Sequence, residues 1–197
     1  MSHDVLLALA GFAVAASITP GPNNLLVLTS GLNHGVGRTL PLIAGISGGF
    51  AFMLVALGIG LGTAMRTTPS LHAAAKISGL AIMLWLAWKI ASSPAEPNAA
   101  PDARAAQPIS SLTGALFQWI NPKAWAIALS AIAAFSDPHA ALTSLAWVSG
   151  AFFVVAFASL SAWAAFGSLM RRAIDSPGKL RTFNIVMALL LIASALP

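Results

Sequence analysis

VLLALAGFAVAASITPGPNNLLVLTSGLNHGVG, residues 5–37, is a run of 33 residues without a formal charge between Asp4 and Arg38. A second uncharged run of 33 residues lies between Asp137 and Arg171. About 20 apolar residues cross a hydrocarbon core of roughly 30 Å, so each run can contain a complete membrane-spanning helix. The two runs predict an all-α, polytopic membrane protein. A polar group at membrane depth is costly there and becomes the first candidate for function.

The composition of the whole chain supports this prediction. Only 8% of the residues are charged and 58% are hydrophobic, whereas a typical soluble domain is about 25% charged. The mean hydropathy of +0.85 leaves no room for a separate soluble domain, so residues 1–197 form one transmembrane domain. The chain has no cysteine, and its four histidines are scattered, so we expect no disulfide, no metal site and no cofactor. The net charge of +5 indicates loops that face anionic lipid rather than nucleic acid.

Six apolar segments divide the chain into two halves. The segments cover residues 5–29, 39–64, 70–91, 111–135, 141–168 and 180–197. Residues 92–110 contain four prolines and several charges, which is typical of a solvated linker, here on the cytoplasmic side. The halves, 1–91 and 111–197, then hold three spans each. Because three is odd, the second half enters from the opposite side, and we expect an inverted repeat, as in many secondary transporters.

The charges of the loops predict the orientation. Seven basic residues lie in the connections between spans 1 and 2, 3 and 4, and 5 and 6: Arg38, Lys89, Arg104, Arg171, Arg172, Lys179 and Arg181. The opposite side holds Arg66, and also Lys76 if its long side chain reaches that interface. The positive-inside rule places the larger group in the cytoplasm and both termini outside.

The first segment contains Thr19-Pro20-Gly21-Pro22-Asn23-Asn24. Each proline removes a backbone donor and clashes with the preceding turn, so a continuous helix is not expected here. Broken backbone at membrane depth is tolerated where it is buried in protein or lines a wet cavity. A helix that restarts after the break presents its positive end, which favours a carboxylate. The alternative interpretation is a packing kink satisfied by neighbouring helices.

The fourth segment carries a second break, Asn121-Pro122-Lys123, preceded by Gln118. Lys123 is the one formal charge well inside a predicted span, and no acidic residue lies at comparable depth to pair with it. We therefore expect its partner to be backbone carbonyls, water or an anionic ligand group. Trp119, four residues earlier, is expected to add a cation–π contact. The alternative is that the helix starts later and Lys123 reaches the cytoplasmic interface.

Two further patterns bear on function. The second segment carries six glycines whose default interpretation is close helix packing, with a moving interface as an alternative: Gly45, Gly48, Gly49, Gly58, Gly60 and Gly62. Catalytic patterns such as HExxH and GxSxG are absent from the sequence, as are a phosphate-binding glycine loop and a pair of intramembrane carboxylates. The sequence therefore disfavours an enzyme, and direct use of ATP would require another subunit.

At both breaks the sequence resembles the LysE/RhtB family of bacterial amino-acid exporters. The resemblance rests on residues 18–24 (ITPGPNN), 34–38 (HGVGR) and 118–123 (QWINPK), with support from 84–90 and 183–190. It is strongest to the cysteine and O-acetylserine exporter branch. The resemblance implies six spans in the bacterial inner membrane, export of small amino acids, and coupling to the proton-motive force.

One departure from the family pattern affects the coupling. Many members of the family carry aspartate where this chain has Asn23. Without it, the proton carrier would be Lys123, a loop histidine or the substrate itself, and the coupling ion stays open. The packing glycines fit a homo-oligomer or a monomer equally well.

The sequence thus favours a secondary exporter of small neutral amino acids that works by alternating access. The expected substrate-binding and gating residues are those of the two breaks: Thr19, Pro20, Gly21, Pro22, Asn23, Asn24, Gln118, Asn121, Pro122 and Lys123. The competing hypotheses are a non-transporting assembly partner or scaffold, and a passive channel.

Overall fold

A computed structural model describes residues 1–61, 69–93, 108–174 and 176–193. All regular elements in these ranges are helices, which confirms the all-α prediction. The longer helices are α1 (His3–Ile18), α2 (Pro22–His34), α3 (Val36–Ala56), α5 (Pro69–Ala91), α6 (Ser111–Phe117), α7 (Pro122–Phe135), α8 (Ala141–Met170) and α9 (Pro177–Ala193). Three short helical turns are η1 (Leu57–Leu61), η3 (Pro138–Ala140) and η4 (Arg171–Ala173).

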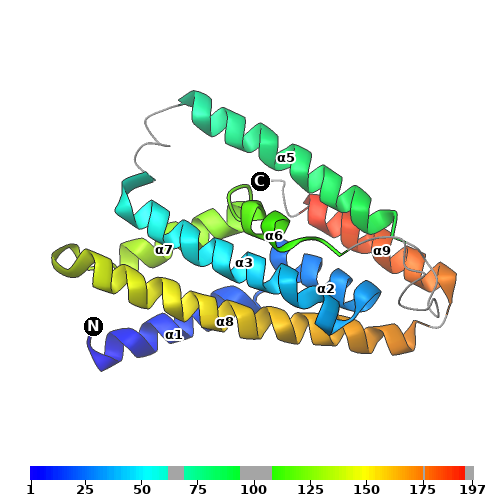
Figure 1. The fold of residues 1–197 in the computed structure, drawn as a ribbon, viewed down its shortest axis with the longest axis horizontal. Coiled ribbons are helices and arrows are strands. Elements are labelled where there is room, and N and C mark those ends of the chain that lie inside the picture. The colour runs from blue at the N-terminus through cyan, green and yellow to red at the C-terminus, as the bar shows by residue number, and fades with distance from the viewer. Residues whose placement is uncertain (62–68, 94–107, 175, 194–197) are drawn as a thin grey trace.

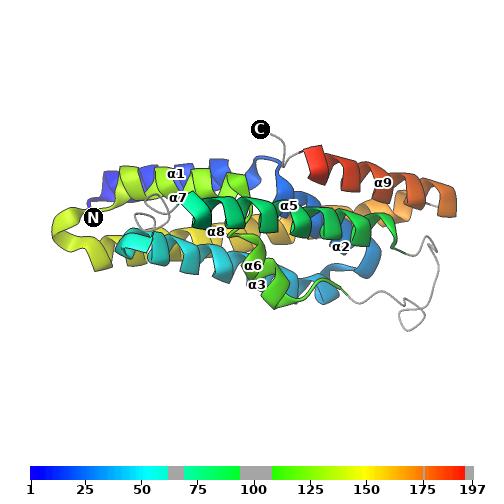
Figure 2. The same cartoon turned by 90° about the horizontal axis from the view of Figure 1, so that it is seen from above.

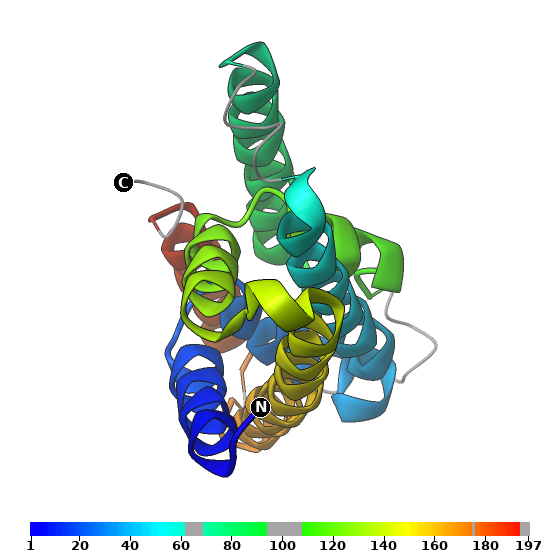
Figure 3. The same ribbon diagram turned by 90° about the vertical axis from the view of Figure 1, so that its left-hand side faces the viewer.

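The helices form an elongated bundle around α8. Figures 1 and 2 show most helix axes running along the long axis of the molecule. The long helix α8 contacts α1, α2, α3 and α7, and α3 also packs on α6. The helix α5 packs mainly on α9, and part of it rises from the bundle when the molecule is seen end-on (Figure 3).

Each of the six predicted apolar segments contains helix in the structure, but not every segment is one uninterrupted membrane-spanning helix. In the described part of the chain, two helices are long and apolar enough to cross a membrane, at Val36–Gly60 and Ala141–Met170. The pair α1 and α2, bent by 58°, makes a third if it counts as one span. The fourth predicted segment consists of the separate helices α6 and α7. Six spans therefore stay a prediction.

Some predictions fall outside the described residues. They concern most of the linker, 94–107, with Arg104, and the loop that holds Arg66. The side chain of Lys76 is likewise outside the described part, and so is the end of the last segment, 194–197.

Charged residues gather at the two ends of the bundle. Arg38 lies in the first turn of α3, Lys89 near the end of α5, and Lys179 in the first turn of α9, and these three helix ends lie toward the same end of the molecule (Figure 1). Asp4 in α1 and Asp137 before α8 lie at the other end. This separation fits the predicted orientation, with the basic end in the cytoplasm. The orientation itself stays a prediction.

The buried apolar residues form two clusters, one toward each end. The cluster toward the basic end joins α2, α3, α5, α8 and α9 and includes Leu26, Ile46 and Leu160. The other cluster joins α1, α3, α7 and α8 and includes Phe50 and Phe152. The breaks between α1 and α2 and between α6 and α7 lie near the level of the bundle at which the two clusters meet.

Candidate functional site

The first break separates α1 from α2. The helix α1 ends at Ile18, and α2 begins with Pro22 at its first position, where proline costs no hydrogen bond. The predicted break is confirmed, although Asn23 and Asn24 themselves lie in the first turn of α2. The first hydrogen bond of α2 runs from the N–H of Leu25 to the oxygen of Gly21, at 3.0 Å. The N–H groups of Asn23 and Asn24 precede that bond, and Gly21 supplies no side-chain cap.

The second break separates α6 from α7. The helix α6 ends at Phe117, a turn follows, and α7 begins with Pro122. The side chain of Asn121 caps α7 by accepting a hydrogen bond from the N–H of Lys123, at 3.1 Å. Lys123 therefore occupies the first turn of α7 rather than the middle of a continuous helix.

Lys123 joins the second break to the first. Its ammonium donates to the backbone oxygens of Thr19 and Pro20, the latter at 3.4 Å. These carbonyls follow the C-terminus of α1, which carries the negative end of the helix dipole. The prediction of backbone carbonyl partners is confirmed. The expected cation–π contact with Trp119 is wrong, because the turn removes the helical spacing, and the Trp119 ring instead packs edge-on against Phe52 and Trp125.

Gly21 leaves the space that the Lys123 side chain occupies. A Cβ atom at Gly21 would lie 2.7 Å from Cδ and 3.1 Å from Nζ of Lys123. The backbone of Gly21 is extended, so the glycine is required by this close approach and not by its φ angle.

A second contact between the breaks is a reciprocal amide pair. Asn23 Nδ2 donates to Gln118 Oε1 at 2.9 Å, and Gln118 Nε2 donates to Asn23 Oδ1 at 3.2 Å. Gln118 is fully buried and also donates to the oxygen of Gly114, at 2.9 Å. The predicted site residues of the two breaks are thus brought together although 95 positions separate Asn23 from Gln118.

We expect the amide pair to contribute measurable coupling. Asn23→Leu leaves the buried Gln118 amide without this contact, and Gln118→Leu does the same to the partly buried Asn23 amide, so each should lower the free energy of unfolding. The double variant should lose less than the sum of the two, by about 0.5–3 kcal/mol. Reversible unfolding in mixed detergent micelles measures all four proteins, and strictly additive losses would show that the pair is not coupled.

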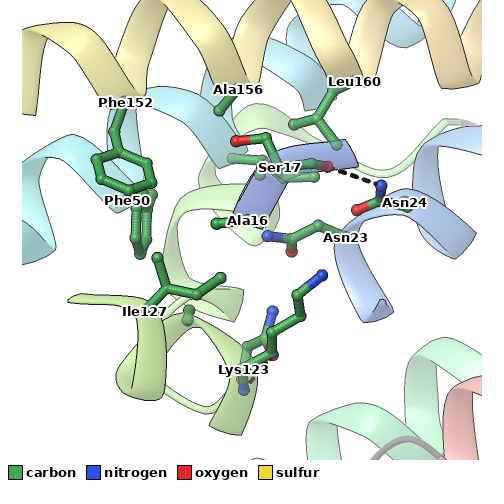
Figure 4. Close-up of a pocket in the computed structure, with 13 residues that line it drawn as sticks. Ala16, Ser17, Asn23, Asn24, Phe50, Lys123, Ile127, Phe152, Ala156 and Leu160 are labelled. Atoms are coloured by element: carbon green, nitrogen blue, oxygen red, sulfur yellow. Dashed lines mark hydrogen bonds between the residues drawn. The ribbon is translucent and has the colours of Figure 1, made fainter. Parts of the chain in front are cut away.

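A cavity of about 50 Å³ lies beside the two breaks (Figure 4). Its polar side consists of Ser17, Asn23, Asn24, Asn121 and Lys123. Its apolar wall comes from α1, α3, α7 and α8 and consists of Ala16, Ile46, Phe50, Ala124, Ile127, Phe152, Ala156 and Leu160. Figure 4 shows the side chains of Lys123 and Asn23 near one another, below the Asn24 amide that donates to the Ser17 oxygen at 3.0 Å.

The cavity lies halfway along the bundle. Ala156, in its wall, is at the middle of the 30-residue α8, which is about 45 Å long. Ile46 belongs to one apolar cluster and Phe50 to the other, so the wall includes the junction between them. If α8 spans the membrane, the cavity lies near the midplane of the bilayer.

Sequence reasoning missed part of this cavity. The oxygen of Ser17 accepts hydrogen bonds from Asn24 and, at 3.1 Å, from Ser159 Oγ. Phe50 and Phe152 form an edge-on aromatic pair in the wall, with ring centroids 5.4 Å apart. The sequence does not distinguish these residues, because serine and phenylalanine occur throughout the apolar segments. They line the cavity because α3 and α8 pack against the two breaks.

Two broken helices that face one cavity midway along an apolar helical bundle have the architecture of a secondary transporter. The model of the LysE type translocator family matches residues 14–196, and the chain belongs to this family of amino-acid efflux transporters. It is therefore an integral membrane transporter of the bacterial inner membrane and not an enzyme.

Individual relatives cover the same length. The proteins named "Cysteine/O-acetylserine efflux protein" from Escherichia coli (strain K12) and Shigella sonnei (strain Ss046) are each 34% identical to the chain over 199 residues. The aligned region covers 99% of this chain and 97% of each relative. No solved structure was found to match.

Proposed function

We propose that this protein exports small neutral amino acids across the cytoplasmic membrane by alternating access, with the cavity between the two breaks as the substrate site. The observation that carries the proposal is that Lys123, from one broken helix, binds the carbonyls that end the other. The breaks, the cavity and the positive charge therefore coincide.

The ends of the broken helix suit a zwitterion. The N–H groups of Asn23 and Asn24 open α2 without a side-chain cap, and the positive end of the helix dipole lies there. The carbonyls that end α1 lie opposite and favour a cation. An amino acid carries both charges on adjacent atoms, so its carboxylate fits the start of α2 and its ammonium fits the carbonyls of Thr19 and Pro20.

In the structure, the Lys123 ammonium lies at the position proposed for the ammonium of the substrate. We propose that an arriving substrate takes over the carbonyls and that the Lys123 ammonium turns to the substrate carboxylate. Asn121 is engaged as the cap of α7, so the uncapped start of α2 is the better place for a carboxylate than the start of α7. The sequence left open whether the helix break or Lys123 binds the substrate carboxylate. The geometry supports one site to which both contribute.

The cavity favours a small, neutral side chain. Its volume of about 50 Å³ accommodates a few water-sized groups, and its wall is apolar. Among the described residues that line it there is no carboxylate to bind a second positive charge. Efflux proteins named for cysteine and O-acetylserine match this chain over almost its whole length, which supports substrates of that size.

Alternating access in this proposal uses the two breaks as hinges of an inverted repeat with six spans. The reciprocal pair of Asn23 and Gln118 and the Lys123 contact hold the breaks together, and substrate binding exchanges these contacts. In a proton-coupled cycle, Lys123 or the substrate carries the proton, because Lys123 is the one titratable side chain among the described residues that line the cavity.

Efflux from loaded cells tests the function. Cells that express the protein, and cells with an empty vector, are loaded with labelled cysteine, O-acetylserine, threonine, homoserine or leucine. We expect the expressing cells to lose one small neutral amino acid faster than the controls, and to export it against its electrochemical gradient. Loss that stops at equilibrium would indicate a passive channel, and no acceleration for any of the five would favour the scaffold.

A further inference from the structure

We infer that a second substrate site, formed by Lys89 and Thr29 on the basic side of the central cavity, binds the carboxylate of the amino acid before it reaches that cavity. The inference rests on the proposed export function and extends it with a site on the cytoplasmic path.

A separate cavity of about 20 Å³ lies between α2, the end of α5 and the segment before α6. That volume is enough for about one water or one carboxylate oxygen. Its polar lining consists of Thr29, Ser30, Asn33, His34, Lys89 and Ser93. Leu26, Ile90 and Ile109 form the apolar part of the lining. Each polar group buried beside them is costly without a partner.

Most of the lining polar groups have partners within the protein. The hydroxyl of Ser30 pairs with Thr39 Oγ1 at 2.9 Å, and Asn33 Nδ2 donates to Asn184 Oδ1 at 3.0 Å. Ser93 Oγ donates to the oxygen of Lys89, at 3.0 Å. These groups stabilise the fold around the cavity.

The Thr29 hydroxyl differs from these three groups. The Thr29 side chain is 2% exposed, and its hydroxyl oxygen has no hydrogen-bond partner. An unsatisfied buried hydroxyl costs about 1–3 kcal/mol relative to a satisfied one. Thr29 lines a cavity large enough for one oxygen, so a ligand oxygen bound there can satisfy the hydroxyl once it turns toward it.

Lys89 supplies the charge that selects an anion. Its Nζ lies 5.5 Å from the centroid of the Trp85 ring, and no carboxylate is among the described residues that line the cavity. An ammonium and a hydroxyl from two residues that line one small cavity match the oxygens of a carboxylate.

The helix α2 connects this site to the central cavity. Asn24 lines the central cavity and Thr29 the second one, about 8 Å apart along the same helix. Lys89 ends α5 at the basic end of the bundle, which is the predicted cytoplasmic end. An exported amino acid that enters there meets Lys89 and Thr29 first and Lys123 second.

Uptake into everted membrane vesicles tests the site, because their cytoplasmic face contacts the medium. Lys89→Gln and Thr29→Val should each raise the KM for the exported amino acid about 5- to 20-fold, the loss of one hydrogen bond, with a similar maximal rate. Lys179→Gln is the matched control, since it removes one exposed basic charge at the same end of the bundle without touching the cavity. Its KM should equal that of the wild type.

Thermal unfolding in detergent separates a ligand site from a structural role. Thr29→Val keeps the shape and removes an unsatisfied hydroxyl, so the variant should unfold at the same temperature as the wild type or higher while its KM rises. A lower unfolding temperature, or an unchanged KM in both variants, would overturn the Lys89–Thr29 site and leave the export function intact. If the wild type transports none of the candidates, the export function fails, and this site fails with it.

Discussion

Replacement of Lys123 by methionine is expected to reduce export by about 10- to 100-fold. Methionine keeps an unbranched, apolar stem but removes the ammonium that binds the oxygens of Thr19 and Pro20. A hydrogen bond to a charged group contributes about 1.5–3 kcal/mol, and 1.4 kcal/mol corresponds to a factor of ten. The variant also loses the cation that we assign to the substrate carboxylate. Initial efflux from loaded cells, at equal protein abundance, measures the effect.

Two companion variants separate charge from position. Lys123→Arg keeps the positive charge but changes its geometry, so it should retain more export than Lys123→Met. Gly21→Ala keeps the lysine and places a methyl group 2.7 Å from its Cδ, so the flexible side chain must shift and its contacts with the two carbonyls are disturbed. We expect Gly21→Ala to lower export with little change in the unfolding temperature. Wild-type export by a well-folded Lys123→Met protein would remove Lys123 from the mechanism.

The two breaks could be predicted from the sequence because their causes are local. Pro22 and Pro122 each occupy the first position of a new helix, the one helical position where a missing N–H costs nothing. The absence of a carboxylate near Lys123 along the chain also led to three possible partners, and backbone carbonyls, one of the three, are the partners in the structure.

The pairing of the breaks could not be predicted, because it depends on how distant helices pack. The sequence around Asn23 does not indicate Gln118 as its hydrogen-bond partner. The reciprocal pair forms because α3 and α8 pack so that both breaks lie at the same level of the bundle. The error over Trp119 has a different origin. A cation–π contact between Trp119 and Lys123 requires a continuous helix between the two residues. Residues 118–120 instead form a turn, so the two side chains do not share a helix face.

The packing of α3 on α6 gives the second large expected effect. A Cβ atom at Gly45 would lie 2.0 Å from the backbone oxygen of Ser111, and one at Gly49 would lie 2.5 Å from the Cα of Ala115. These atoms belong to the backbone of α6, which cannot rotate away as a side chain can. The expectation of close packing is confirmed at both glycines and at Gly58, where a Cβ atom would lie 2.3 Å from the Leu145 side chain. It is wrong at Gly48 and Gly60, where a Cβ atom meets nothing within 4 Å, and Gly62 lies outside the described residues.

We expect Gly45→Ala to lower the free energy of unfolding by at least about 3 kcal/mol, the upper part of the range for overpacked interiors, because the two helices must separate. The site should suffer as well, since Gln118 directly follows α6 and would shift with it, away from Asn23. Export should therefore fall even where some protein folds. The unfolding temperature in detergent and the efflux rate per folded molecule measure the two effects.

Gly48→Ala is the control for this prediction. Gly48 lies three residues further along α3, and a Cβ atom there meets nothing within 4 Å. The same chemical change in the same helix should therefore leave stability and export near the wild type, or raise stability slightly, because alanine favours the helix by up to about 1 kcal/mol over glycine. Equal losses in both variants would mean that helix propensity or insertion, and not contact with α6, limits this part of the fold. A loss confined to Gly45 would show that a backbone contact between α3 and α6 is needed for stability and for the position of Gln118 against Asn23.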